Sequence, residues 1–296
     1  MRSRTKPDSA LGSAAAALAL VALFAASAAN AHESIEEQIA RVDEEIRMAP
    51  DDAGLYLQRA ELFRIHGKVD ESMADYRRAA RLDPGLGAFE LGLGRLFLAA
   101  GRADEALGHL QRFLVGRPDD MRGLACRGRA LQALGRFEAA VRDYSAAIAR
   151  SAGTGRVDPD LYVERAQALR AIGAERLDEA LTGLDEGMSR LGSIPALELL
   201  AIELEIGGGR SAEALRRVRV AAARSLRPER WLVLEGEILE KAGRAAEARN
   251  AFSAARTAID DLPPSRRLTP LVDDLNERLT AALERLGGVA RVEAAR

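Results

Sequence analysis

The sequence predicts an all-α solenoid, in which helical hairpins repeat along the chain. Two residue spacings carry the prediction: Gly67, Gly101 and Gly135 follow one another at 34 residues, and Pro84 and Pro118 share that interval. A fixed period of roughly 20 to 50 residues is typical of repeat architectures. Apolar residues also recur at helical spacing between these marks. One hairpin cannot bury both of its faces alone, so neighbouring hairpins are expected to stack.

The clearest repeat covers residues 87–120. It is expected to contain a first helix over 89–100 and a second helix over 103–115. The glycine between them ends the first helix, because glycine enters the left-handed conformation without a steric penalty at Cβ. The proline after the second helix stops it. Gly94 and Ala106 are small where the two helices must cross closely.

Three consecutive units carry the same residue types at the same places. The first unit has Ala60, Phe63, Gly67, Ser72, Tyr76, Ala79 and Pro84; the second has Gly94, Phe97, Gly101, Ala106, Leu110, Phe113 and Pro118; the third has Gly128, Leu131, Gly135, Ala140, Tyr144 and Ala147. This pattern resembles the tetratricopeptide repeat (TPR) family. The resemblance implies a right-handed superhelix of helix-turn-helix repeats with a capping helix at each end. A generic helical bundle is the alternative, but a bundle needs no fixed period.

Residues 1–31 have the features of a secretory signal peptide. A basic start precedes an apolar stretch over residues 14–29 and the small-x-small sequence Ala29-Asn30-Ala31. We therefore expect export, to the periplasm of a Gram-negative cell; secretion, or anchoring by an uncleaved signal, is the alternative. The stretch is short and weakly hydrophobic for a membrane span. No span is expected after cleavage.

The remaining chain is expected to form five segments. They are an N-terminal capping helix at 32–52, three regular TPR units at 53–150, a linker or insertion at 151–160, three degenerate TPR units at 161–264, and a C-terminal capping helix with a tail at 265–296. The insertion is either a hinge or a longer loop.

The last helix is expected to begin at Pro270 and to stop at Gly287-Gly288. Its expected apolar face consists of Leu268, Leu271, Val272, Leu275, Leu279, Leu283 and Leu286. Residues 289–296 are then a loose tail.

The residue pattern suggests neither catalysis nor a metal or cofactor site. The histidines, His32, His66 and His109, lack a second ligand at i+3 or i+4. The acid pairs Asp51-Asp52, Asp119-Asp120, Asp260-Asp261 and Asp273-Asp274 are expected at or near helix starts, where carboxylates offset the helix dipole. We therefore expect no enzyme activity, no metal and no cofactor.

The net charge and the cysteine content limit the classes of partner and of covalent cross-link that are expected. The net charge is −2, and −4 without residues 1–31, which argues against nucleic acid. Cys126 is the single cysteine, so no disulfide forms within the chain. A protein or peptide partner is expected.

The expected site lies on the first helices of the units, because in the TPR family these helices line a concave groove. Their inner positions hold Arg64, Leu91, Arg95, Leu98, Arg122 and Arg129. Arg95 and Arg129 occupy the same place in successive units and would suit an acidic peptide or a C-terminal carboxylate. The alternative is that these arginines are solvated, or pair with Glu61 and Glu90 nearby.

The expected function is a non-catalytic scaffold or adaptor for protein or peptide partners in the bacterial cell envelope. The resemblance to exported TPR proteins implies a role in envelope assembly or polymer export. The alternative class is a glycan-binding or small-ligand-binding component of such a system.

Overall fold

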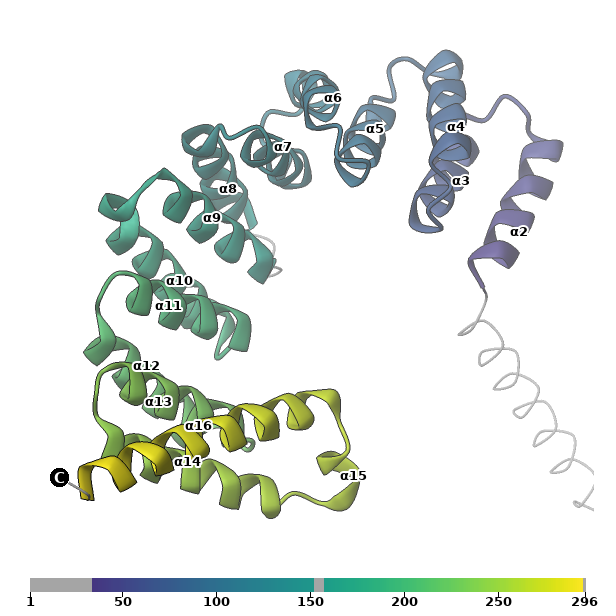
Figure 1. Cartoon of the computed structure of the whole chain (residues 1–296). Helices are drawn as coiled ribbons and strands as arrows, with labels where there is room; N and C mark the ends of the chain where they lie inside the picture. Colours follow the sequence, from purple (N-terminus) through teal and green to yellow (C-terminus); the bar gives the residue numbers. More distant parts are fainter. Residues whose placement is uncertain (1–33, 152–156, 295–296) are drawn as a thin grey trace, which may run out of the picture. The chain divides into compact units, whose positions relative to one another are not determined.

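The computed structural model describes residues 34–151 and 157–294, and every regular element in them is helical (Figure 1). The expected signal peptide and residues 152–156 of the expected insertion lie outside the described residues. By their internal contacts, the helices form two compact parts, residues 1–116 and residues 117–296. Within each part the helices pack against their neighbours in chain order. The predicted all-α solenoid of helical hairpins is confirmed.

In the first part, an N-terminal helix packs on the first of two hairpins. The helices are α2 (Ile35–Met48), α3 (Ala53–Ile65), α4 (Val69–Leu82), α5 (Ala88–Ala99) and α6 (Ala103–Gly116). Ser34 and Glu37 form a capping box at the start of α2, in which each side chain accepts from the backbone N–H of the other residue. Val42 and Ile46 form the buried face of α2.

In the second part, hairpins follow one another up to a long last helix. The elements are α7 (Met121–Ala133), α8 (Phe137–Ser151), α9 (Pro159–Ile172), the 3-10 helix Ala174–Arg176, α10 (Leu177–Leu191), α11 (Pro195–Gly207), α12 (Ser211–Arg224), α13 (Glu229–Lys241), α14 (Ala245–Asp260), α15 (Pro264–Arg267) and α16 (Pro270–Ala294). The 3-10 helix lengthens the turn between α9 and α10. This extra length explains why Ala180 comes two residues later than the equivalent alanine of the regular units.

Glycines at the hairpin turns and at the helix crossings do what the repeat pattern requires. Gly101 and Gly135 both have a φ of 71°, in the left-handed region. At the crossing of α5 and α6, a Cβ on Gly94 would lie 2.6 Å from Leu110 Cγ. At the crossing of α7 and α8, a Cβ on Gly128 would lie 2.7 Å from Tyr144 Cε1. The small residues therefore set how closely the helices of each hairpin approach.

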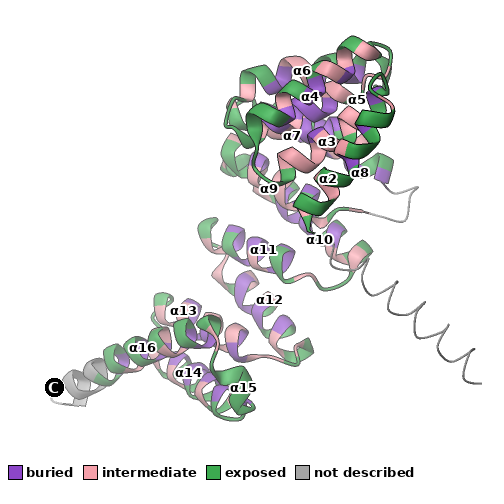
Figure 2. Cartoon of the chain, turned by 90° about the vertical axis from the view of Figure 1, so that its right-hand side faces the viewer, coloured by how far each residue is buried: buried purple, intermediate pink, exposed green. Residues whose placement is uncertain are grey.

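The buried residues lie on the helix faces that meet inside and between hairpins (Figure 2). At the C-terminal end, α16 packs on α13 and α14. Trp231, Phe252 and Leu275 belong to the hydrophobic cluster that these helices share. The last helix thus shares the core of the final hairpin, and its capping role stays a prediction.

Two expectations about α16 are wrong. Leu268 and Leu271 are 84% and 45% exposed, so the buried face begins only at Val272. The helix also continues past Gly287-Gly288 to Ala294. Gly287 does not adopt a left-handed conformation, and a glycine that stays helical costs only about 1 kcal/mol relative to alanine. Nowhere in residues 34–151 and 157–294 is a helix both long and apolar enough to cross a membrane.

Candidate functional site

In the first part, the predicted arginines converge on one carboxylate, that of Glu61 on α3. Arg64 Nε donates to Glu61 Oε2 at 3.0 Å. Arg95 reaches across from α5, and its Nη1 lies 3.3 Å from both carboxylate oxygens. The Tyr76 hydroxyl of α4 donates to Oε1 at 2.6 Å. Pairing with Glu61, the alternative that the sequence left open, is therefore what both arginines do.

This cluster keeps one net positive charge. Burial alone would raise the pKa of Glu61, but the Tyr76 hydroxyl and the two guanidinium groups outweigh it and hold that pKa below its ordinary value. Burial, and then the neighbouring carboxylate, raise the pKa of Tyr76. At neutral pH the cluster thus contains one carboxylate, one neutral phenol and two guanidinium groups.

Arg95 is the more loosely held of the two arginines. Only one of its nitrogens contacts Glu61, at the long distance of 3.3 Å, and its side chain is 41% exposed. A guanidinium group has five N–H donors in a planar fork, so most donors of Arg95 remain for another acceptor. Leu98, three residues after Arg95 on α5, is half-buried. Leu91 is buried and offers a partner little surface.

Glu90, the other expected partner of the arginines, lies in a separate cluster between α5 and α6. It is 2.6 Å from His109 Nδ1, and Arg112 Nε donates to it at 2.8 Å. The His109 ring also stacks on Phe97 at a centroid distance of 5.3 Å. His109 therefore has a structural setting, and Glu90 does not neutralise Arg95.

In the second part, Arg129 and Arg122 each have a partner. Arg129 Nε on α7 donates to Glu164 Oε1 on α9 at 2.6 Å. Burial raises the pKa of Glu164, and the attraction to Arg129 only partly opposes this. The second oxygen, Glu164 Oε2, is buried and has no hydrogen-bond partner among the described residues. Arg122 instead pairs with Asp120 on its own helix turn.

The acid pairs serve the helix ends, with one exception to the prediction. Asp52 and Asp120 accept backbone N–H groups at the starts of α3 and α7. Asp260-Asp261, which we expected near a helix start, stand at the end of α14 instead, because α15 begins only at Pro264. Within the described ranges, no group of three His, Cys, Asp or Glu side chains could hold a metal ion.

The degenerate units contain a cavity that the sequence did not predict. It has a volume of about 620 Å³ and is formed by α10, α11 and α12. The repeat pattern gave no sign of it, because the cavity depends on side chains of three helices at positions that the family pattern leaves variable.

Comparisons with known proteins agree with the fold. A family model, tetratricopeptide repeat, matches residues 53–86. The sequence matches no protein of curated function. Three solved structures are similar at low identity. They are a tetratricopeptide repeat protein from Parabacteroides merdae (16% identity, TM-score 0.52, 83% of this chain and 92% of that chain covered), PilW, a widely conserved type IV pilus biogenesis factor (18%, 0.56, 64% and 86%), and pilF of Pseudomonas aeruginosa (15%, 0.52, 76% and 96%).

At these identities the likeness concerns the fold. It agrees with the period, the turn glycines and the small residues at the helix crossings, all of which the structure places as a TPR requires. Residues 53–86 thus belong to the tetratricopeptide repeat family, and the described chain has the fold of tetratricopeptide repeat proteins.

Proposed function

We propose that the protein is a non-catalytic scaffold that holds a protein or peptide partner against α3 and α5, with an acidic group of the partner on Arg95. The observation that carries this proposal is the excess of positive charge around Glu61. Two guanidinium groups share this one carboxylate, and the more exposed one, Arg95, is held at 3.3 Å.

A partner carboxylate can bind Arg95 without dismantling the cluster. The hydrogen bonds from Tyr76 and Arg64 would continue to satisfy Glu61. The planar fork of Arg95 could then bind the incoming carboxylate through two parallel N–H···O bonds, which are about twice as strong as neutral hydrogen bonds. The polar groups of the cluster are two guanidinium groups and a phenol that donate to one carboxylate. This arrangement suits binding better than proton transfer.

The proposed location is the bacterial cell envelope, after export to the periplasm. This part of the proposal rests on the basic start, apolar stretch and small-x-small sequence of residues 1–31. Fractionation of cells that express the full chain, with N-terminal sequencing of the recovered protein, tests it. Recovery of the intact N-terminus from the cytoplasm would contradict export.

The binding proposal is tested by capture. The purified protein is immobilised, envelope extract is passed over it at low and high salt, and the retained proteins are identified by mass spectrometry. Arg95→Ala is expected to lose the partner. Arg81→Ala, which removes an exposed arginine at the end of α4, is the matched control and should retain it. Equal retention by both variants would contradict the role of Arg95. Saturable binding of a soluble glycan with no captured protein would favour the alternative class.

A further inference from the structure

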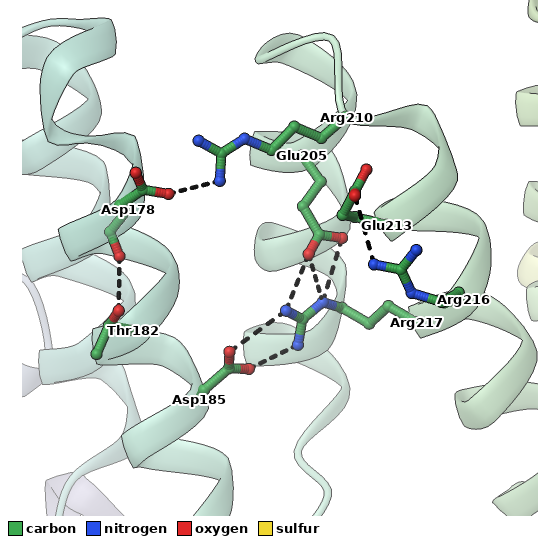
Figure 3. Close-up of polar contacts among 8 residues, drawn as sticks. All are labelled: Asp178, Thr182, Asp185, Glu205, Arg210, Glu213, Arg216 and Arg217. Carbon is green, nitrogen blue, oxygen red and sulfur yellow. Dashed lines mark hydrogen bonds and ion pairs between the residues drawn. The ribbon is translucent and has the colours of Figure 1, made fainter.

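The cavity between α10, α11 and α12 has one wall built around Arg217. In Figure 3, Arg217 of α12 lies between Asp185 of α10 and Glu205 of α11. Its Nη1 is 2.6 Å from Asp185 Oδ1, and its Nη2 is 2.9 Å from Glu205 Oε1. Burial opposes the charge of Arg217, but the bonds to both carboxylates raise its pKa. Its donors face these two carboxylates, so this guanidinium is already satisfied, and the trio keeps one net negative charge.

Another carboxylate of the cavity, Glu198, has no arginine partner. It lies in the first turn of α11 and is only 7% exposed. Its Oε1 accepts a hydrogen bond from the Ser193 hydroxyl at 2.9 Å. Across the described parts of the chain, no arginine, lysine or histidine forms an ion pair with Glu198, although its side chain is largely buried. A largely buried carboxylate without a counter-ion is costly, so a cation bound beside Glu198 would stabilise it.

Apolar side chains line the same cavity. Met188 of α10 is half-buried, and Val220 of α12 is 49% exposed although it is a large apolar residue. These two side chains can cover a methylene chain, whose burial away from water is favourable. Arg224, an exposed cation, also lines the cavity and forms no ion pair among the described residues.

We propose that this cavity binds an alkylammonium group, the chemistry of a lysine side chain, with the ammonium on Glu198 and the methylene stem against Met188 and Val220. An organic cation fits better than a metal ion, because no three metal-ligating side chains gather anywhere in the described residues. Arg224 adds a positive charge to the lining of the cavity, so a ligand with a single ammonium fits better than a polyamine. This site is separate from Arg95 and does not depend on the function proposed there.

Isothermal titration calorimetry with three small probes tests the proposal. Lysine blocked at both ends as Nα-acetyl methylamide presents the side chain as a polypeptide would, and pentylamine presents a free amine. Blocked norleucine has an apolar side chain without the ammonium. The blocked lysine is expected to bind and the blocked norleucine is not. Binding of pentylamine alone would still place an alkylammonium in the cavity, but would identify the ligand as a free amine.

Two variants locate the binding. Glu198→Gln is expected to weaken binding about 10-fold to 100-fold, the loss typical of a hydrogen bond to a charged group. Glu247→Gln, the same change at a half-exposed side chain of α14 that does not line the cavity, should bind like the wild type. Equal binding of the lysine and norleucine probes, full binding by Glu198→Gln, or no binding of either amine overturns the proposal.

A third variant covers the case in which Glu198→Gln does not fold, as judged by its circular dichroism. Ser189 is exposed and lines the cavity, so Ser189→Lys should fold and place a tethered ammonium at the site. This variant is expected to lose binding of the probes by competition. Undiminished binding by Ser189→Lys would also overturn the proposal.

Discussion

Replacing Asp143 by asparagine tests whether buried ion pairs between the two helices of a hairpin stabilise the array. Asp143 of α8 is 7% exposed and accepts two hydrogen bonds from Arg127 of α7, from Nε and from Nη2, each at 2.7 Å. The pair recurs in the first repeat, where Arg59 Nε lies 2.7 Å from Asp75. Asparagine keeps the shape of the side chain and removes its charge.

The expected loss follows from the two bonds. Asparagine has one acceptor oxygen, so one bond to Arg127 is lost and the other loses its charge on the acceptor side. A hydrogen bond to a charged group contributes about 1.5–3 kcal/mol, and removing one partner of a fully buried pair costs about 3–5 kcal/mol. The Arg127 side chain is 29% exposed and can recover some hydration. We therefore expect the free energy of unfolding to fall by about 2 kcal/mol.

Urea denaturation followed by far-UV circular dichroism measures this loss as a shift of the midpoint. Arg127→Gln and the double variant complete a double-mutant cycle, in which we expect a coupling energy of about 1–2 kcal/mol. Hydrogen exchange should place the loosened amides in α7 and α8.

The matched control is Glu247→Gln. Arg244 contacts Glu247 with similar geometry, at 2.7 Å and 2.6 Å, but both side chains are roughly half exposed. Solvent and salt screen such a pair, so the midpoint should not move. Equal shifts for the two variants, or none for Asp143→Asn, would refute the argument that burial makes the Arg127 pair stabilising.

Three further outcomes are expected. Gly94→Ala should lower stability by about 1 kcal/mol in thermal unfolding, because the new Cβ would lie 2.6 Å from the buried Leu110; Gly108→Ala, whose Cβ has room in α6, should not destabilise. The folded-state pKa of Glu61 is lowered. Its contribution to the free energy of unfolding is therefore full above the ordinary pKa of 4.5 and is lost as pH falls through the folded-state pKa. Glu61→Gln should make the urea midpoint less dependent on pH in that acidic range. The folded-state pKa of Glu164 is raised. Its contribution to the free energy of unfolding is therefore full below the ordinary pKa of 4.5 and is lost as pH rises through the folded-state pKa. Glu164→Gln should remove this fall of the urea midpoint with rising pH.

The period of the sequence was enough to predict the hairpins. Gly101 must adopt a left-handed backbone conformation, and Gly94 must leave room for the Leu110 side chain. Both requirements depend on local geometry that is the same in each repeat. The end of α16 depends on no repeat. No local interaction requires Gly287-Gly288 to leave the helical conformation, so the prediction that the helix ends there was wrong.

The ion pairs of the site were harder to predict. The sequence left both Glu61 and Glu90 open as partners of the arginines, but Glu61 lies across the α3–α5 contact from Arg95, whereas Glu90 contacts His109 of α6. The choice depends on the direction in which each side chain leaves its helix. That Glu198 accepts a hydrogen bond from Ser193 but forms no ion pair likewise depends on the three-dimensional arrangement of the side chains, which the repeat pattern does not specify.

Trp231 is the only tryptophan of the chain, and it is buried in the cluster that α16 covers. Its fluorescence therefore reports on the C-terminal end alone, whereas circular dichroism averages over all helices. In a repeat array each hairpin contacts mainly its neighbours, and cooperativity can break down along the chain. The difference between the unfolding midpoints measured by tryptophan fluorescence and by circular dichroism thus directly measures how strongly the unfolding of one hairpin is coupled to that of the next.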